Sequence, residues 1–502
     1  MEYKLDFDGS EVNRCLLCSD PPCSGACPQG APVGDIMRSL YFSNVSEAHR
    51  KSKKIDCTYC NAPCVDACVL KHEKVPLDIR TCIMSINDSE KEIPKPKISK
   101  VNLSTDICGV KLENPFLLSS SVVASTYDMC KRAFEAGWAG VAFKTICNFP
   151  QREASPRFSA IHNHANAFCG FKNIEQLSDH SVEENMQIFR HLKSDFPDKV
   201  IVASIMGSNA QEWTRLASEC EKAGASVIEC NFSCPNLEDG DLGVTIGQSE
   251  TLIERFTRAT KSGTSLPVLV KLTPNITDMV PMALAAKEGG ADGIAAINTI
   301  NSITGVNIDT LVAEPSVRGR SIVGGYSGSA VKPIALRFIS DLAKAKGLEG
   351  LHISGMGGIE TWIDALEFIL LGAGSVQVTT SVMQYGYRII DDLISGLSYY
   401  MKAKGISSVK KLIGGAVSSV VDHRSIERGT ILLPVFDTEK CIGCGRCYIS
   451  CMDGGHQAIR FDKETRRPHL TGSKCVGCHL CRLVCPVNAV GVAKKTIANK
   501  AK

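Results

Sequence analysis

The chain has 502 residues, of which 44% are hydrophobic, and a formal net charge of +3 at pH 7. This length accommodates about three domains, and the near-neutral charge excludes the basic excess of proteins that bind nucleic acid or an anionic membrane surface. We find no apolar run long enough to span a bilayer and no signal peptide, so we expect a cytoplasmic protein.

The unusual feature of the composition is its 24 cysteines, most of which cluster near the two ends of the chain. A disulfide scaffold would be short and secreted, and this chain fits neither description. Clustered thiols in a long chain of this kind indicate metal ligands.

Residues 1–95 form the first predicted domain, which contains nine cysteines. Eight of them make two groups of four, and Cys82 follows alone: Cys15, Cys18, Cys23 and Cys27, then Cys57, Cys60, Cys64 and Cys68. Such closely spaced thiolates suit iron–sulfur clusters or zinc, and the C-terminal motif described below favours iron–sulfur. A helix is predicted at 33–42, and the charged stretch 91–97 with its two prolines predicts a linker.

Residues 96–428 form the second predicted domain, in which strands and helices alternate. Eight short, mainly apolar runs predict strands buried on both faces: 116–122, 140–144, 200–206, 227–231, 268–272, 293–298, 350–354 and 375–379. Amphipathic segments such as 212–222, 279–288 and 334–346 separate some of these runs. This rhythm predicts a (β/α)8 TIM barrel, with a doubly wound sheet as the alternative. Polar residues at the strand ends favour the barrel, whose active face lies there.

The segment Asn231-Phe232-Ser233-Cys234-Pro235 closes one predicted strand and precedes a loop with two glycines. A thiol at a strand end beside such a loop is a candidate acid or base, although an isolated cysteine is more often buried and inert. Glycine-rich turns at 324–330, 354–358 and 371–374 predict a phosphate site near the last strands, with tight-turn geometry as the alternative. We find no G-x-G-x-x-G between a strand and a helix, so we expect no Rossmann domain.

Residues 429–502 form the third predicted domain, which carries the spacing C-x2-C-x2-C-x3-C twice. This is the motif of two-cluster ferredoxins, in which the fourth cysteine of each run binds the other cluster. The spacing therefore predicts two [4Fe-4S] sites, one of Cys441, Cys444, Cys447 and Cys485, and one of Cys475, Cys478, Cys481 and Cys451.

With these motifs in view, the chain resembles the dihydropyrimidine dehydrogenase family over nearly its whole length, without that family's central FAD- and NADPH-binding part. The resemblance implies an FMN-binding barrel that reduces uracil or thymine, or catalyses the reverse reaction, with hydride passing to C6 and Cys234 donating a proton to C5. It implies pyrimidine contacts from Asn173, Asn231, Ser233, Asn298 and Thr299. The expected FMN-binding residues are Ser120, Lys144, Thr145, Lys271, Ser327, Gly328, Gly357, Gly358, Thr379 and Thr380.

The resemblance also implies four [4Fe-4S] clusters in all. One N-terminal cluster is expected on Cys15, Cys18, Cys23 and Cys68, and the next on Cys27, Cys60, Cys64 and a fourth ligand. We predict Cys82 for that position, with Cys57 as the alternative. Electrons would come from a flavoprotein subunit or a ferredoxin, and we expect a homodimer or heterotetramer. The rivals are a dihydroorotate dehydrogenase and an electron-transfer subunit that acts on another substrate.

Overall fold

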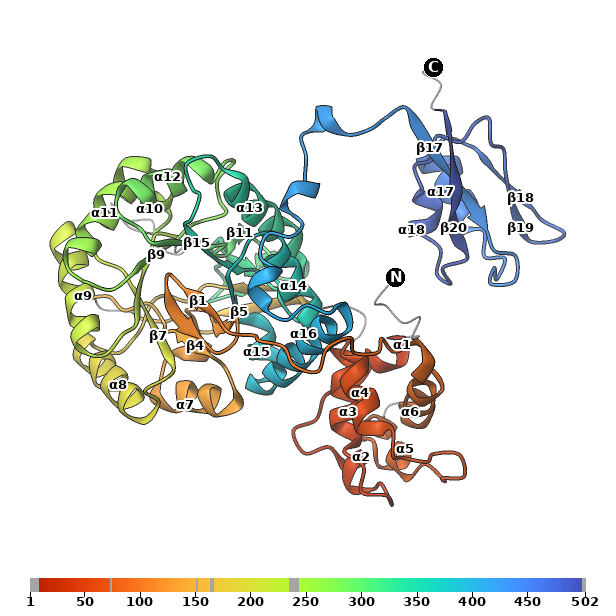
Figure 1. The fold of residues 1–502 in the computed structure, drawn as a ribbon, viewed down its shortest axis with the longest axis horizontal. Coiled ribbons are helices and arrows are strands. Elements are labelled where there is room, and N and C mark those ends of the chain that lie inside the picture. Colours follow the sequence, from red (N-terminus) through yellow and green to blue (C-terminus); the bar gives the residue numbers. More distant parts are fainter. Residues whose placement is uncertain (1–8, 73–74, 150–151, 163–166, 234–242, 499–502) are drawn as a thin grey trace. The chain divides into compact units, whose positions relative to one another are not determined.

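The computed structural model describes residues 9–72, 75–149, 152–162, 167–233 and 243–498. The chain divides into two compact units, Met1–Ser419 and Val420–Lys502. The predicted N-terminal domain and the barrel both lie within the first unit (Figure 1). Among the described helices, none combines the length and the apolar character needed to cross a membrane.

The first unit is built on a closed barrel of eight parallel strands, in the spatial order β10-β15-β16-β3-β4-β7-β8-β9. The strands are β3 (Phe116–Leu118), β4 (Gly140–Ala142), β7 (Val200–Ile205), β8 (Val227–Asn231), β9 (Val268–Lys271), β10 (Gly293–Ala296), β15 (His352–Met356) and β16 (Ser375–Val378). Each lies within or overlaps one of the eight predicted runs. The prediction of a (β/α)8 barrel is therefore confirmed, and the doubly wound alternative is wrong.

Helices surround the barrel, and their side-chain caps show why they begin where they do (Figure 1). Asn209 and Ser249 accept hydrogen bonds from the first turns of α9 and α11, and Thr361 forms a capping box at α14. The helices after β3 are α7 (Tyr127–Ala136), α8 (Val182–Asp195), α9 (Ala210–Lys222), α10 (Val244–Gly247), α11 (Glu250–Ser262), α12 (Val280–Glu288), α13 (Lys332–Lys344), α14 (Trp362–Leu370), α15 (Thr380–Tyr385) and α16 (Ile390–Lys404).

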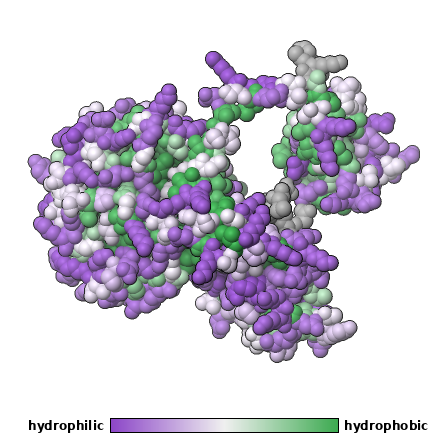
Figure 2. Space-filling model, viewed as in Figure 1, coloured by the Kyte–Doolittle hydropathy of each residue, from purple (hydrophilic) through white to green (hydrophobic). Residues whose placement is uncertain are grey.

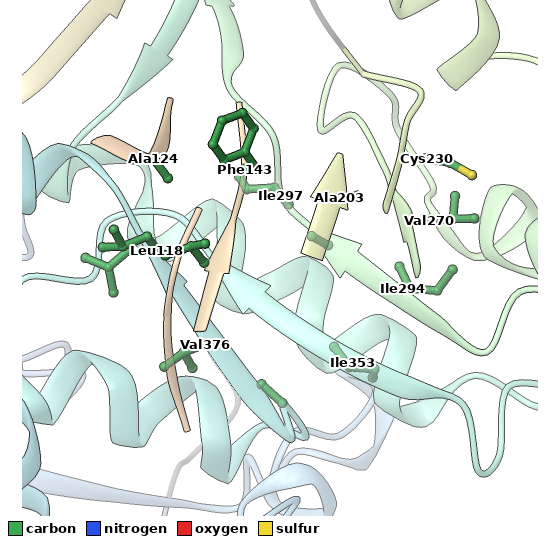
Figure 3. Close-up of a cluster of buried hydrophobic side chains, with 14 of the residues drawn as sticks. Leu118, Ala124, Phe143, Ala203, Cys230, Val270, Ile294, Ile297, Ile353 and Val376 are labelled. Atoms are coloured by element: carbon green, nitrogen blue, oxygen red, sulfur yellow. The ribbon is translucent and has the colours of Figure 1, made fainter. Parts of the chain in front are cut away.

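Side chains of the barrel strands alternate between two apolar clusters, as the two-residue period of a strand requires. One cluster joins strands to helices and includes Leu118, Phe143 and Val376, which are labelled with some of their neighbours in Figure 3. The second fills the barrel interior and includes Leu117 and Leu269, together with residues of the hairpin β1 (Thr105–Ile107) and β2 (Val110–Leu112). Figure 2 shows a mainly hydrophilic outer surface over the barrel helices.

A four-stranded antiparallel sheet, which the sequence did not predict, is inserted in the barrel's connections. Its spatial order is β11-β14-β6-β5, and it pairs two segments that are far apart in the chain. The strands are β5 (Phe158–His162), β6 (Phe168–Asn173), β11 (Ile300–Ser302) and β14 (Gly324–Ser327), and a small hairpin of β12 (Val306–Asn307) and β13 (Val312–Ala313) lies between β11 and β14 in the sequence. This sheet brings Asn173, at the end of β6, opposite Gly325 of β14.

The N-terminal region is helical, and its polar contacts fix it to the barrel. Buried Asp392 of α16 accepts hydrogen bonds from Arg38 Nε at 2.9 Å, Ser39 Oγ at 2.8 Å and Asn44 Nδ2 at 3.1 Å. A buried carboxylate needs such partners, so these contacts define one orientation of the two regions. The helices are α1 (Gly9–Val12), α2 (Pro22–Gly25), α3 (Val33–Tyr41), α4 (Val45–Ser52), α5 (Pro63–Ala67) and α6 (Ile79–Asp88).

The described part of the second unit contains two antiparallel strand pairs and two α-helices. The long pair is β17 (Thr430–Phe436) with β20 (Val490–Ala498), and the short pair is β18 (Ile459–Asp462) with β19 (Arg467–Leu470). The helices are α17 (Arg446–Gly454) and α18 (Leu480–Leu483). Each helix follows the first cysteines of one motif, so the two motifs are built alike.

Candidate functional site

A cleft of about 1130 Å³ opens at the C-terminal ends of the barrel strands. This volume includes the solvent-filled mouth of the cleft. Fourteen of the residues predicted from the sequence line this cleft: Ser120, Lys144, Thr145, Asn173, Asn231, Lys271, Asn298, Thr299, Ser327, Gly328, Gly357, Gly358, Thr379 and Thr380. They come from both the barrel and the inserted sheet.

The amide of Asn231 is oriented by a network of hydroxyl groups. Its Nδ2 donates to Thr145 Oγ1 at 2.8 Å, and its Oδ1 accepts from Ser233 Oγ at 3.1 Å. Asn298 Nδ2 donates to the carbonyl oxygen of Ser233 at 2.8 Å. Ser233 is fully buried and lies behind the cleft rather than on its wall. It therefore orients two amides, and Cys234, the residue that follows it, lies outside the described residues.

Lys144 and Lys271 are the two cations among the described residues that line the cleft. Lys144 Nζ lies 3.3 Å from Glu153 Oε1 and 3.6 Å from Glu175 Oε1. Burial raises the pKa of Glu175, which also faces Arg157 at 3.4 Å. The charge of Lys144 is thus already balanced by carboxylates.

Lys271 has its own buried carboxylate in the barrel interior. Its Nζ lies 3.9 Å from Oε1 of Glu229, and the two side chains are 3% and 0% exposed. The alternation along β8 and β9 places both residues on the inward face, because Leu269 of β9 and Val227 of β8 belong to the interior cluster. Lys271 Nζ also approaches Ser119 Oγ at 3.4 Å.

Another part of the cleft wall has the bare backbone that suits a phosphate group. Gly357 and Gly358 have φ angles of +122° and +80°, in the region that favours glycine. A Cβ at Gly358 would lie 2.9 Å from the backbone oxygen of Gly328 and from the backbone nitrogen of Lys332. Nearby, Ser327 Oγ and Thr380 Oγ1 are 2.9 Å apart. These residues form a narrow cradle of backbone and hydroxyl groups.

Three further features of the cleft were not predicted from the sequence. The buried Oε1 of Gln377 has no hydrogen-bond partner within the described residues, so it is free to accept from a ligand N–H group. Burial raises the pKa of Glu360, near the cradle, to about 7. Glu175 was also missed, although its position two residues after Asn173 on the approach to the cleft is a usable signal.

The N-terminal thiols interact electrostatically in two overlapping sets. Cys23 interacts electrostatically with Cys15, Cys18 and Cys68, the set that the resemblance implies. Burial, with some contribution from neighbouring thiols, raises the pKa of Cys15 to about 11. Thiols crowded in this way become stable thiolates only when a metal or cluster binds them.

The second N-terminal group includes Cys57. The thiol of Cys57 interacts with those of Cys60 and Cys27, and the thiol of Cys64 interacts with Cys57 and Cys27. Cys82 lies buried on α6, in an apolar cluster with residues such as Ile79, Ile83 and Ile86. Cys64 and Cys68 belong to the same cluster and Cys57 packs against it, so the predicted Cys82 and the alternative Cys57 both share this cluster with other thiols.

The C-terminal cysteines line two separate cavities, each with one of the predicted sets of four. One cavity is lined by Cys441, Cys444, Cys447 and Cys485, and the other by Cys451, Cys475, Cys478 and Cys481. Backbone N–H groups of Gly477, Ala458 and Ala489 donate to the sulfurs of Cys475, Cys451 and Cys485. Donors aimed at sulfur suit the charged thiolates of an iron–sulfur cluster. The exchange of the fourth cysteine between runs is the arrangement that the spacing predicts.

Comparison with known proteins agrees with this architecture. Residues 102–401 match the family described as dihydroorotate dehydrogenase, and residues 435–492 match the 4Fe-4S dicluster domain. The chain is 52% identical over 389 residues to the NAD-dependent dihydropyrimidine dehydrogenase subunit PreA of Escherichia coli (strain K12), covering 78% of this chain and 95% of that protein.

Two more distant relatives are named for two different reactions. The chloroplastic dihydropyrimidine dehydrogenase (NADP(+)) of Arabidopsis thaliana is 36% identical over 340 residues, which cover 65% of this chain and 80% of that protein. The catalytic subunit of dihydroorotate dehydrogenase B (NAD(+)) of Pyrococcus abyssi is 37% identical over 318 residues, which cover 63% and 99%. All three relatives are pyrimidine oxidoreductases by name.

Proposed function

Because this chain belongs to the dihydroorotate dehydrogenase family of oxidoreductases, we propose that its barrel reduces the 5,6 double bond of uracil or thymine, or catalyses the reverse reaction. The similarity to the PreA subunit supports this choice over other reactions of the family. The cleft supports it independently through the chemistry of the side chains around it.

The proposal rests on two properties of the cleft. Its side-chain amides are held in fixed orientations, and its lysines are already paired with carboxylates. Asn231 and Asn298 are held by Thr145 and Ser233, which leaves polar groups of both amides for a ligand. An uncharged ring with alternating carbonyl and N–H groups pairs with such amides. Orotate would bring an extra carboxylate, and both lysines of the cleft already face carboxylates.

The residues of the cleft fit FMN. The cradle of Gly328, Gly357, Gly358, Thr379 and Thr380 would hold the phosphate. The ring system would be bound by Ser120, Lys144, Thr145 and Lys271, with the unpaired Oε1 of Gln377 as a further acceptor. FMN, when bound, supplies hydride transfer to C6 of the pyrimidine.

The chain itself would orient the pyrimidine and deliver the proton. Asn173, Asn231, Asn298 and Thr299 would hold the polar edges of the ring. We assign the proton donor for C5 to Cys234, because its ordinary pKa, about 8.5, keeps a thiol protonated at neutral pH. The hydrogen bonds of Ser233 fix the end of β8 directly before this residue.

The thiol groups would hold four [4Fe-4S] clusters that pass single electrons to the barrel. Our proposed ligands for the second N-terminal cluster are Cys27, Cys57, Cys60 and Cys64, so Cys57 replaces Cys82. The other three sets are those predicted from the sequence. A separate electron donor would supply the electrons. The name of PreA describes that protein as a subunit.

Anaerobic turnover with reduced methyl viologen as the electron source tests the proposal without a protein partner. We expect kcat/KM for uracil or thymine to exceed that for orotate by at least about tenfold, since an unmatched buried charge costs more than 1.4 kcal/mol. Equal or greater activity with orotate would instead establish a dihydroorotate dehydrogenase. Consumption of neither ring would reject both functions.

A further inference from the structure

Among the described residues of the N-terminal region, the large hydrophobic side chain with the highest exposure stands beside the second thiol group. Tyr59 is 93% exposed and lies between Cys57 and Cys60 in the sequence. Tyrosine buries a large area when a partner binds, and it is enriched among residues that dominate binding energy. A nearly fully exposed tyrosine beside a redox site is therefore a candidate contact for another protein.

Side chains from two other segments hold the part of the loop that precedes Tyr59. Gln29 Nε2 donates to the carbonyl oxygen of Asp56 at 2.6 Å, and Asp56 N donates to Gln29 Oε1 at 3.1 Å. Arg80 Nη2 donates to the carbonyl oxygen of Thr58 at 2.7 Å. A partner that binds this loop would meet a preformed surface and would avoid the entropic cost of ordering it.

Two exposed lysines precede this loop in the sequence. Lys53 and Lys54 end the turn after α4, both are exposed, and neither forms an ion pair within the described part of the chain. In contrast, Arg50 and Lys51, which precede them, both pair with Glu47. Together with Arg80, Lys53 and Lys54 place three cations beside the loop. The loop itself contains the carboxylate of Asp56.

The first thiol group faces the barrel instead. Leu17 and the partly buried Cys15 pack in the main apolar cluster of the barrel. Arg388 donates to the carbonyl oxygen of Cys18 at 3.1 Å and to that of Leu17. The first group is thus the inner one, and the second group, beside Tyr59, is the outer one.

We propose that Tyr59, Lys53 and Lys54 form the docking surface for an electron-donor protein that carries carboxylates around its redox centre. Each encounter oxidises the donor by one electron and reduces the outer cluster by one electron. Two encounters, together with two protons, account for the reduction of one ring double bond. The inference rests on the proposed iron–sulfur function and adds to it the point of electron entry and the charge of the partner.

The test uses the full-length, cluster-loaded protein with an acidic 2[4Fe-4S] ferredoxin as the donor probe. Complex formation is measured by calorimetry, and cluster reduction is followed by stopped-flow absorbance at several salt concentrations. We expect the reduction rate of the unmodified protein to fall with salt. The double variant Lys53→Glu/Lys54→Glu should react at least about tenfold more slowly at low salt and lose this salt dependence. Tyr59→Ala should raise Kd by about tenfold or more.

A matched control is Lys344→Glu/Lys346→Glu, which makes the same charge change at exposed positions at the end of α13 on the barrel. This control should keep ferredoxin binding within about twofold. Methyl viologen, a small cation that needs no docking surface, should reduce all variants equally. The docking proposal is overturned if Lys53→Glu/Lys54→Glu leaves ferredoxin binding unchanged, or if the control weakens it equally.

The two proposals can fail separately. Uracil turnover driven by methyl viologen tests the barrel reaction and does not involve the docking surface. Absent turnover with ferredoxin binding intact would reject the proposed function alone. Normal turnover with charge-insensitive ferredoxin reduction would reject the docking surface alone.

Discussion

The buried pair of Glu229 and Lys271 makes a quantitative prediction about the barrel. Two unit charges 3.9 Å apart interact by about 4 kcal/mol at an effective dielectric constant of about 20. Lys271→Met would remove the cation and leave a fully buried carboxylate without a counter-charge. Breaking a buried pair in this way typically costs about 3–5 kcal/mol, so we expect the free energy of unfolding to fall by about 4 kcal/mol. The double variant Lys271→Met/Glu229→Gln should recover most of this loss.

Tryptophan fluorescence during urea unfolding measures this change in the barrel specifically. All three tryptophans of the chain, Trp138, Trp213 and Trp362, are buried in the barrel. Lys261→Met is the matched control, because Lys261 pairs with Asp292 at 2.6 Å but the two side chains are 36% and 40% exposed. That change should cost less than about 1 kcal/mol. If the double variant is no more stable than Lys271→Met, the carboxylate of Glu229 does not depend on Lys271, and the reasoning fails.

Three further predictions concern single side chains. Burial raises the pKa of Glu360 to about 7. The stability that the protonated carboxyl contributes is therefore present at low pH and is lost as the pH rises from the ordinary pKa of a glutamate through about 7. In urea unfolding, Glu360→Gln should stabilise the protein more at pH 8 than at pH 5. Cys57→Ser should remove about four iron atoms per chain by elemental analysis and Cys82→Ala should remove none, and the reverse result would restore Cys82 as the ligand. Cys234→Ala should lower kcat for uracil by about 10²–10⁴-fold while calorimetry still detects uracil binding, and normal turnover would remove Cys234 from its role as acid.

The barrel was predictable because its strands are short apolar runs, buried on both faces and bounded by turn residues. The cleft followed from the same pattern, because the carboxyl ends of parallel strands meet at one face, which brings Lys144, Asn231 and Lys271 together. The inserted sheet was not predictable in this way, because it pairs β6 with β14, about 150 residues later. Local patterns carry no information about such long-range pairing.

The ligands of the second N-terminal cluster show a different limit. Spacing alone does not distinguish Cys57 from Cys82, since both are near the other cysteines in sequence. The proposed choice of Cys57 rests on the interactions of its thiol with those of Cys27, Cys60 and Cys64, which depend on packing and not on spacing. The C-terminal ligands were easier to predict because both runs repeat one strict motif.

Together, the ion pairs of the cleft affect which substrates it prefers. Lys144, Lys271 and Arg157 face Glu153, Glu175 and Glu229, so the cations of this region are already matched by an equal number of carboxylates. A carboxylate on the substrate would add a further negative charge to this region, where low polarity strengthens repulsion. In the proposed arrangement the phosphate of FMN would bind the backbone cradle at Gly328, Gly357 and Gly358 and not the lysines, so one cleft would hold an anionic cofactor and still prefer an uncharged ring.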